Sequence, residues 1–277
     1  MAPDAYVLGT DAFEAERLRL QHDVWLPLAQ AAWERAGLAP GQRVLDLGAG
    51  PGFASLELAR LVGGRGRVLA LERSPAYLEQ AEAAAAASGL SQLEVRRHDL
   101  GAEEPPVWGR EAAGFDLAWC RWVAMFLPRL EPLITVLRTG LRPGGRFLTQ
   151  EYVQWDTFGL HPYGEAVARF GAATQESFRA AGGDPDVNRR LPALLVSRGF
   201  RIDHLRPLPV LGRGGDGWCQ WLERFVSLYG QELIRQGLWS EAEAEEAAAE
   251  MAAARTDPGS YWVGPLVLEL QATRVGP

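Results

Sequence analysis

The sequence predicts a single α/β domain built on a doubly wound, mostly parallel sheet. Three observations support this prediction. Short apolar strands alternate with helical segments from Arg43 to Trp155, the pattern of a parallel sheet that helices cover on both faces. A glycine-rich turn follows the first of these strands. The 277 residues, 47% of them hydrophobic and 23% charged, suffice for one large domain with its own core.

The first part of the chain predicts a helix, a strand and a second helix. Residues 11–33 place apolar side chains among charged ones at a helical spacing, with Pro27 as a potential break. Glycine and proline at 37–41 end this helix. The sequence RVLDLGAGPG at 43–52 is expected to form a buried strand that runs into the glycine turn, and 53–63 the helix that follows.

Two further strands and an alanine-rich helix come next. RVLALE at 67–72 is expected to be the second buried strand, and LEVRRHD at 93–99 the third. Ser74 and Pro75 suit the N-cap and first turn of the helix between them, which ends at Gly89.

The alternation continues to a fifth strand and then changes. FDLAWCR at 115–121 is the expected fourth strand, 132–141 a helix, and GGRFLTQEYVQW at 144–155 the fifth strand. Beyond it the sequence predicts mainly helices, with two more strands. The helices are expected at 163–181, 186–197, 217–236 and 240–255, and the strands at 200–211 and 262–274.

Charge and composition exclude several classes of function. The chain has 35 acidic residues against 28 basic ones, all arginine, and a formal net charge of -7. Nucleic acids and anionic membranes both require clustered positive charge, which this chain lacks. Two cysteines and four scattered histidines predict neither a disulfide framework nor a metal site. The chain shows no basic, apolar leader and no apolar run of about 20 residues, so a cytoplasmic protein is expected.

The turn in VLDLGAGPG indicates a ligand site. Asp46 lies two positions before Gly48, and Gly50 and Gly52 follow at a spacing of two. Glycines at such a turn let the backbone approach a ligand closely. A dinucleotide fingerprint would require glycine or alanine where this chain has Phe53, so NAD and FAD are disfavoured.

Three further features accompany the turn. Glu72 ends the second strand, where a carboxylate can accept hydrogen bonds from both hydroxyls of a ribose. The alternative is that Glu72 is a solvated carboxylate on the surface. Asp99 ends the third strand, placed to accept a hydrogen bond from the exocyclic amine of an adenine, with the Leu100 amide beside it. Residues 143–145 form a tight turn directly before the fifth strand. We expect these positions to converge at the carboxyl ends of neighbouring strands, where open α/β sheets bind ligands.

With these motifs, residues 44–152 resemble the class I S-adenosylmethionine-dependent methyltransferases. The resemblance implies a Rossmann-like methyltransferase fold of seven strands, in which an antiparallel strand around Leu266 inserts between the fifth and the sixth. It also implies S-adenosylmethionine as the cofactor. The expected organisation is a single methyltransferase domain over 1–277, with an N-terminal helical cap at 1–40, a cofactor-binding core at 41–155, and helical insertions and closing strands at 156–277.

The resemblance assigns cofactor contacts to the turn and the strand ends. Asp46 would lie near the methionine part of the cofactor, Glu72 would hold the ribose, and Asp99 would hold the adenine. Cys120 and Arg121 would face the sulfonium end. The implied cofactor-binding residues are Asp46, Gly48, Ala49, Gly50, Glu72, Arg73, Asp99, Leu100, Cys120 and Arg121.

Several of these residues also have a purely structural interpretation. Asp46 and Asp99 could cap helices, because aspartate is common at strand-to-helix junctions. Arg121 could pair with Glu151 instead of meeting the carboxylate of the cofactor. Cys120 could be a small core residue, since buried free cysteine packs as an apolar group.

The methyl acceptor is expected beyond the fifth strand, under a cover of N-terminal and late helices. Glu151 and Tyr152 at the strand end, and His161 in the loop after it, are the candidates for a catalytic residue. A histidine suits a general base because its pKa lies near neutral pH, while a loop residue without a role is the alternative for His161. Aromatic residues in this region line an apolar pocket or belong to the core; they are Trp155, Phe158, Trp218 and Trp221.

The sequence therefore predicts methyl transfer from S-adenosylmethionine to a small, hydrophobic or aromatic molecule, without metal, nucleic acid or membrane. Two alternatives stay open. One is a non-catalytic, methyltransferase-like binding subunit, because a fold does not fix a function. The other is a nucleotide-dependent oxidoreductase. Assembly as a homodimer is also open.

Overall fold

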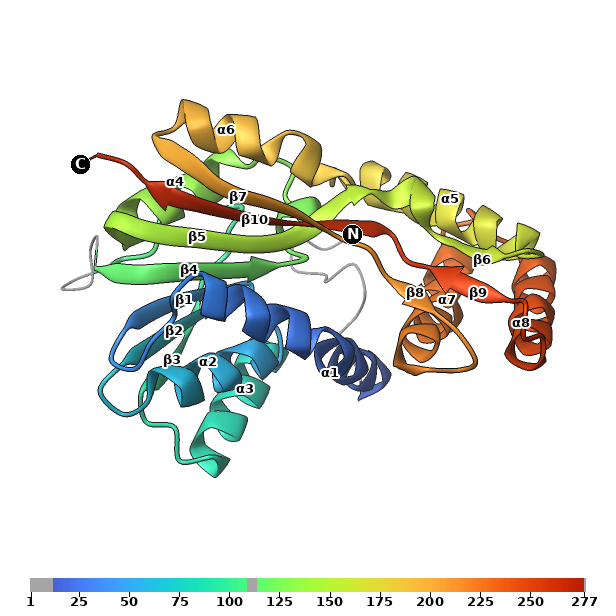
Figure 1. Ribbon diagram of the computed structural model, residues 1–277, viewed down its shortest axis with the longest axis horizontal. Helices are drawn as coiled ribbons and strands as arrows, with labels where there is room; N and C mark the ends of the chain where they lie inside the picture. The colour runs from blue at the N-terminus through green and yellow to red at the C-terminus, as the bar shows by residue number, and fades with distance from the viewer. Residues whose placement is uncertain (1–11, 109–113, 277) are drawn as a thin grey trace.

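A seven-stranded sheet forms the centre of the computed structural model, which describes residues 12–108 and 114–276 (Figure 1). Across the sheet the strands are β3 (Leu93–Arg97), β2 (Arg67–Glu72), β1 (Arg43–Leu47), β4 (Phe115–Arg121), β5 (Leu141–Gln154), β10 (Leu266–Arg274) and β7 (Phe200–Leu208). The first five are parallel, whereas β10 is antiparallel to both of its neighbours. The doubly wound sheet and its inserted antiparallel strand are therefore confirmed.

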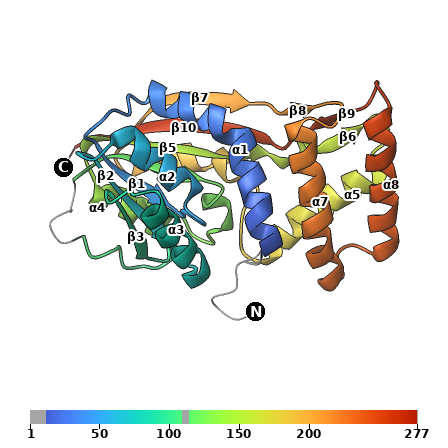
Figure 2. The ribbon, with the colours of Figure 1, turned by 90° about the horizontal axis from the view of Figure 1, so that it is seen from below.

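Helices cover both faces of this sheet. One face carries α1 (Ala12–Arg35), α2 (Phe53–Val62) and α3 (Pro75–Ala87), and the other carries α4 (Glu131–Gly140) and α6 (Leu191–Ser197) (Figures 1 and 2). Side chains alternate between the faces of a strand. In β1, Val44 accordingly packs in the cluster under α1 and α2, while its neighbour Leu45 belongs to the cluster under α4.

A second group of elements extends past the carboxyl ends of the central strands (Figure 1). It contains the helices α5 (Glu165–Ala180), α7 (Gly217–Arg235) and α8 (Glu241–Thr256), and a small antiparallel sheet of β6 (Gly159–His161), β9 (Tyr261–Val263) and β8 (Leu211–Gly212). Helix α1 packs beside α7 (Figure 2). These elements therefore lie where the ligands of an open α/β sheet are expected.

Two short 3₁₀ turns, η3 (Trp155–Thr157) and η4 (Val187–Arg189), connect the two groups. A third, η2 (Ala124–Phe126), lies between β4 and α4. Among the described ranges, 12–108 and 114–276, no helix is long and apolar enough to cross a membrane.

The structure corrects several predicted boundaries. Pro27 does not break α1, because Trp25 and Ala29 on either side of it are buried in the core. The strand predicted at 262–274 is two strands, since Gly264 and Pro265 interrupt it and proline lacks the N–H that a ladder requires.

Two more corrections concern the same half of the chain. The strand predicted at 200–211 is likewise divided into β7 and β8, and the helix predicted at 186–197 is the turn η4 followed by α6. Strand β6 was not predicted, because its three residues pair with β9, about 100 positions later in the chain.

Candidate active site

The glycine turn after β1 leaves its backbone open on one side. Gly48, Gly50 and Gly52 all adopt positive φ angles, of 71°, 55° and 85°. A Cβ built on Gly50 would meet no atom of the described residues within 4 Å, whereas one on Gly48 would lie 2.4 Å from the Cγ2 atom of Val123. The turn therefore offers the close backbone approach that its sequence predicts, and offers it at Gly50.

Glu72 connects the end of β2 to this turn. Its side chain is buried, and its Oε2 atom accepts a hydrogen bond from the Gly50 N–H at 2.9 Å. Its Oε1 atom accepts from the N–H groups of Arg73 and Ser74, at 2.9 and 2.8 Å. The alternative of a solvated surface carboxylate is wrong. Because a carboxylate offers about four lone-pair positions, Glu72 keeps capacity for a ribose hydroxyl.

Asp46 is a buried carboxylate beneath the turn. Its Oδ2 atom accepts a hydrogen bond from the Ser55 hydroxyl of α2 at 2.5 Å. Burial raises the pKa of Asp46 to about 6, although the Ser55 hydrogen bond and the charge of Arg121 oppose that shift. The bond to Asp46 comes from a hydroxyl instead of a helix N–H, so the helix-cap interpretation does not describe it.

Arg121, at the end of β4, has an incompletely satisfied guanidinium. Its Nη1 atom is buried without a hydrogen-bond partner among the described residues, and its Cζ atom lies 4.9 Å from the ring centre of Trp122. No ion pair joins it to Glu151 within the part of the chain that the structure describes, since one carboxylate oxygen of Glu151 accepts backbone N–H groups instead. Burial lowers the pKa of Arg121 to about 10, opposed by Asp46, so the group stays cationic at neutral pH. The position suits an anionic group such as a carboxylate.

Two cavities flank the turn, and both are lined by Gly48 and by Trp122, Val123 and Phe126 of the segment after β4. The first holds about 1010 Å³ of space, part of it open to solvent, and the second about 570 Å³. The first is also lined by Asp46, Ala49, Gly50 and Arg121, and the second by Glu72, Arg73, Asp99 and Leu100. Nine of the ten predicted cofactor residues therefore meet at this cleft.

Two predicted placements do not hold. Cys120 lines neither cavity; it is fully buried in the core, where burial raises the pKa of its thiol, as the small-core-residue interpretation expects. The tight turn expected before the fifth strand, at 143–145, lies within the first part of β5, at the opposite end of the sheet from the cleft. A Cβ on Gly145 would lie 2.9 Å from the carbonyl oxygen of Phe115, the first residue of β4.

Asp99 lies two residues beyond the end of β3 and is exposed. Its Oδ1 atom accepts the Gly101 N–H at 2.8 Å, so it caps a local turn in addition to lining the second cavity.

We expect Asp99→Ala to weaken binding of S-adenosylhomocysteine about 3- to 10-fold, the effect of one exposed hydrogen bond. The inosine analogue of this ligand lacks the amine and should bind the variant and the wild type alike. Titration calorimetry with both ligands measures this, and equal losses for both would show that Asp99 acts through its turn alone.

The predicted catalytic candidates occupy three different environments. Tyr152 lines the first cavity, stacked on Trp122 with ring centres 5.9 Å apart, and burial raises the pKa of its phenol. Glu151 is fully buried and lines neither cavity. The expected position of His161 near the acceptor is wrong: it is exposed on β6, with its ring 5.1 Å from that of Tyr261. The pairing of β6 with β9 carries it away from the cleft.

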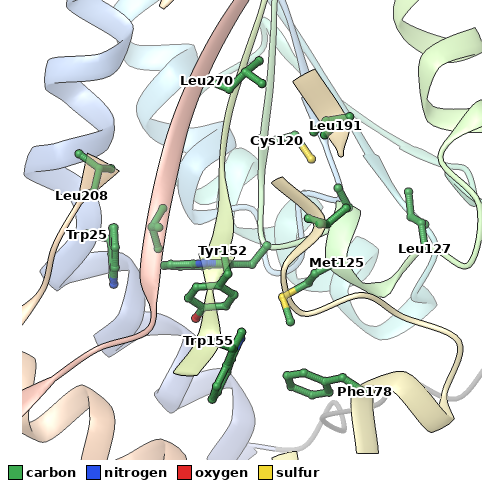
Figure 3. Close-up of a cluster of buried hydrophobic side chains, with 14 of the residues drawn as sticks. Trp25, Cys120, Met125, Leu127, Tyr152, Trp155, Phe178, Leu191, Leu208 and Leu270 are labelled. Atoms are coloured by element: carbon green, nitrogen blue, oxygen red, sulfur yellow. The ribbon is translucent and has the colours of Figure 1, made fainter. Parts of the chain in front are cut away.

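Aromatic side chains form the far wall of the first cavity. Figure 3 shows Tyr152, Trp155 and Phe178 beside one another, with Met125 nearby. Of the four predicted aromatic residues, Trp155, Phe158 and Trp221 line the cavity. Trp218 does not; it packs against Trp25 at 5.3 Å as a core residue.

Sequence reasoning missed the residues that α1 contributes. Arg17, Gln21 and His22 all line the first cavity. His22 is buried with its Nδ1 atom unpartnered in the described structure, and burial, aided by Arg121 and Arg19, lowers its pKa to about 4. The signal available was the expected helical cap itself, whose residues 17, 21 and 22 share one face at helical spacing.

Comparison with known proteins identifies the family of this chain. A methyltransferase domain model matches residues 38–194, more than half of the sequence. The chain belongs to the methyltransferase domain family. The chain is 31% identical over 123 residues to the arsenite methyltransferase of Halobacterium salinarum, an alignment that covers 44% of the chain and 30% of that protein.

A second relative is the aklanonic acid methyltransferase DauC of Streptomyces sp., which is 30% identical to this chain over 145 residues, 52% of the chain. The alignment spans 64% of DauC, so the chain covers between about a third and two thirds of these two relatives.

Solved structures share the fold of this chain at low sequence identity. The geranyl diphosphate C-methyltransferase of Streptomyces coelicolor matches with a TM-score of 0.56 and 13% identity, over 92% of this chain and 77% of that one. A methyltransferase-like protein of Bacillus halodurans matches with a TM-score of 0.57 and 18% identity, over 89% and 98% of the two chains.

The residues of the cleft fit S-adenosylmethionine, the cofactor that the sequence resemblance implies. The open backbone at Gly50 admits a ligand, and the unpartnered Nη1 atom of Arg121 suits a carboxylate. Glu72 lies at the strand end where a ribose is expected. Asp46 and Arg121 would hold the amino-acid end of the cofactor, and Asp99 with Leu100 the adenine.

Proposed function

We propose that this chain transfers the methyl group of S-adenosylmethionine to a small hydrophobic or aromatic molecule. The observation that supports this proposal is the aromatic wall of the first cavity, which continues away from the glycine turn. The wall is formed by Trp122, Phe126, Tyr152, Trp155, Phe158, Phe178, Trp221 and Phe225.

The packing of this wall favours a flat, apolar acceptor. Trp155 contacts Tyr152 edge to face at 5.4 Å, and Trp122 stacks on Trp221 at 6.0 Å. Aromatic rings prefer such offset and edge-to-face partners, so an aromatic acceptor can replace water against them favourably. Because the chain has a net charge of -7, a free small molecule suits it better as a substrate than a nucleic acid does.

The cofactor supplies both the electrophilic methyl group and the leaving group, so the protein has to align the reactants and keep water out. The aromatic wall excludes water from the acceptor side. Arg121 and Asp46 fix the charged end of the cofactor against the turn, and Tyr152 lines the cavity as a neutral phenol, because burial raises its pKa. His22 is neutral as well and a weak base, since its pKa is lowered to about 4.

We therefore expect Tyr152→Phe to reduce turnover by about tenfold at most, since it removes a hydrogen-bond donor and leaves the ring. His161→Ala is expected to leave turnover unchanged, because His161 lies outside both cavities. Steady-state kinetics on the same acceptor measures both variants. A loss of about a thousandfold in Tyr152→Phe would instead indicate acid–base catalysis by the phenol.

The test of the proposed function has two steps. Titration calorimetry should first show that the chain binds S-adenosylhomocysteine. Incubation of S-adenosylmethionine with a panel of aromatic acids, phenols, polycyclic ketones and polar amines, followed by mass spectrometry, should then show methylation within the aromatic set. Binding without any methylated product would favour the non-catalytic subunit. Methylation restricted to the amines would contradict the proposed substrate class.

A further inference from the structure

Residues 122–126, here called the bridging segment, separate the two cavities of the cleft. Trp122, Val123 and Phe126 line both of them. Val123 packs directly on the glycine turn, since its Cγ2 atom lies 2.4 Å from where a Cβ of Gly48 would be. The position of this segment therefore determines how the two cavities connect over Gly48.

The bridging segment has a backbone that requires support. Trp122 has a φ angle of 52°, and a bulky residue seldom adopts this left-handed conformation unless its surroundings enforce it. The 3₁₀ turn η2, which begins two residues later, has only three residues. Within the segment, the Phe126 N–H donates to the Val123 carbonyl at 3.0 Å, and the Met125 carbonyl accepts the Asp184 N–H at 2.8 Å. The N–H groups of Val123 and Ala124 require a further acceptor.

Glu151, on the neighbouring strand β5, supplies the support. Its Oε1 atom accepts the N–H groups of Val123 at 2.7 Å and of Ala124 at 3.0 Å. Its Oε2 atom is buried without a hydrogen-bond partner among the described residues. The backbone carbonyl of Glu151 in turn accepts the Asn188 side-chain amide at 3.1 Å, which fixes it on the sheet.

Glu151 is poorly placed for proton transfer. It is fully buried and lines neither cavity, and the bridging segment that it binds lies at both of them. A buried carboxylate that leaves one oxygen unsatisfied is costly, so hydrophobic packing alone does not account for it.

We propose that Glu151 is a positioning residue. It holds the bridging segment in place and so keeps the passage between the two cavities at the width that the cofactor requires. This inference rests on the proposed function and deepens it. It gives Glu151 an indirect role in cofactor binding and removes it from the candidates for a general base. It acts through the two backbone N–H groups and contacts neither cofactor nor acceptor.

The decisive comparison is between Glu151→Gln and Glu151→Leu. Glutamine keeps an oxygen that accepts the N–H groups of Val123 and Ala124, whereas leucine has none. We expect Glu151→Gln to bind S-adenosylhomocysteine within about threefold of the wild type and to keep its kcat. Glu151→Leu should raise the dissociation constant at least about tenfold and raise KM for S-adenosylmethionine more than it lowers kcat.

A matched control separates positioning from the general effect of removing a buried carboxylate. Glu269 on β10 is equally buried, accepts hydrogen bonds from Arg35 at 2.6 Å and Gln150 at 3.0 Å, and lines neither cavity. Glu269→Leu should lower the melting temperature and leave the affinity for S-adenosylhomocysteine unchanged. Calorimetry and thermal unfolding are recorded on all variants.

Three outcomes would overturn the assignment. Glu151→Gln could lose turnover as fully as Glu151→Leu while still binding S-adenosylhomocysteine, which would make Glu151 a base. Glu151→Leu could bind like the wild type. If the leucine variant does not fold, Glu151→Asp replaces it as the test, because it withdraws the carboxylate by one methylene. Wild-type affinity of Glu151→Asp for S-adenosylhomocysteine would contradict the proposal. Failure of the wild type to methylate any acceptor would count against the proposed function alone, since the binding comparison requires no acceptor.

Discussion

Gly50→Ala is expected to fold and to lose at least about 100-fold in affinity for S-adenosylhomocysteine, a change of about 2.7 kcal/mol. The φ angle of Gly50 is 55°, so the added methyl group costs about 1–2 kcal/mol in backbone energy. Within residues 12–108 and 114–276 it meets no atom closer than 4 Å, so it occupies the open space over the turn that the cofactor requires. Titration calorimetry measures the affinity, and thermal unfolding measures the stability.

Gly89→Ala is the matched control for this variant. Gly89 follows α3 and has a φ angle of 65°, and a Cβ there would also meet no atom within 4 Å in the part of the chain that the structure describes. It should therefore lose the same stability as Gly50→Ala and keep the affinity of the wild type. Wild-type affinity in folded Gly50→Ala would show that the cofactor does not approach the turn at Gly50.

Glu72→Ala is expected to weaken S-adenosylhomocysteine binding about 30- to 300-fold and to destabilise the chain. The substitution removes the acceptor of three backbone N–H groups, those of Gly50, Arg73 and Ser74. A buried donor left without its partner costs about 1–3 kcal/mol, and the glycine turn loses its connection to β2. A ribose hydroxyl would lose its acceptor as well.

Glu72→Gln separates these two contributions. It keeps one oxygen to accept N–H groups and puts an amide donor where the second oxygen was, so we expect affinity and melting temperature between those of the wild type and Glu72→Ala. Calorimetry with S-adenosylhomocysteine and unfolding in denaturant give the two quantities. If Glu72→Ala lost stability but bound at wild-type strength, the assignment of Glu72 to the ribose would be wrong.

The cofactor half of the cleft could be predicted because its residues are local in sequence. Asp46 and Glu72 each follow a short apolar strand, and parallel strands bring their carboxyl ends to one edge of the sheet. The limits of β2 and β4 agree with the prediction for the same reason, since continuous apolar runs mark buried parallel strands.

The acceptor half could not be predicted, because distant segments form it. The indole N–H of Trp221 on α7 donates to the Oε1 atom of Gln21 on α1 at 3.1 Å, across 200 positions of sequence. No local pattern encodes such a contact. The displacement of His161 has a similar cause, the long-range pairing of β6 with β9, and the support that Glu151 gives to Val123 depends on the pairing of β4 with β5.

The place of β10 in the sheet has a consequence for folding during synthesis. β10 lies between β5 and β7 and pairs with both, yet the ribosome makes it after either of them. Until residues 266–274 emerge, β5 and β7 each present an unpaired edge, and such edges recruit strands from other chains. A nascent chain that stalls before Leu266 should therefore be prone to aggregation even though every cofactor residue has already been made.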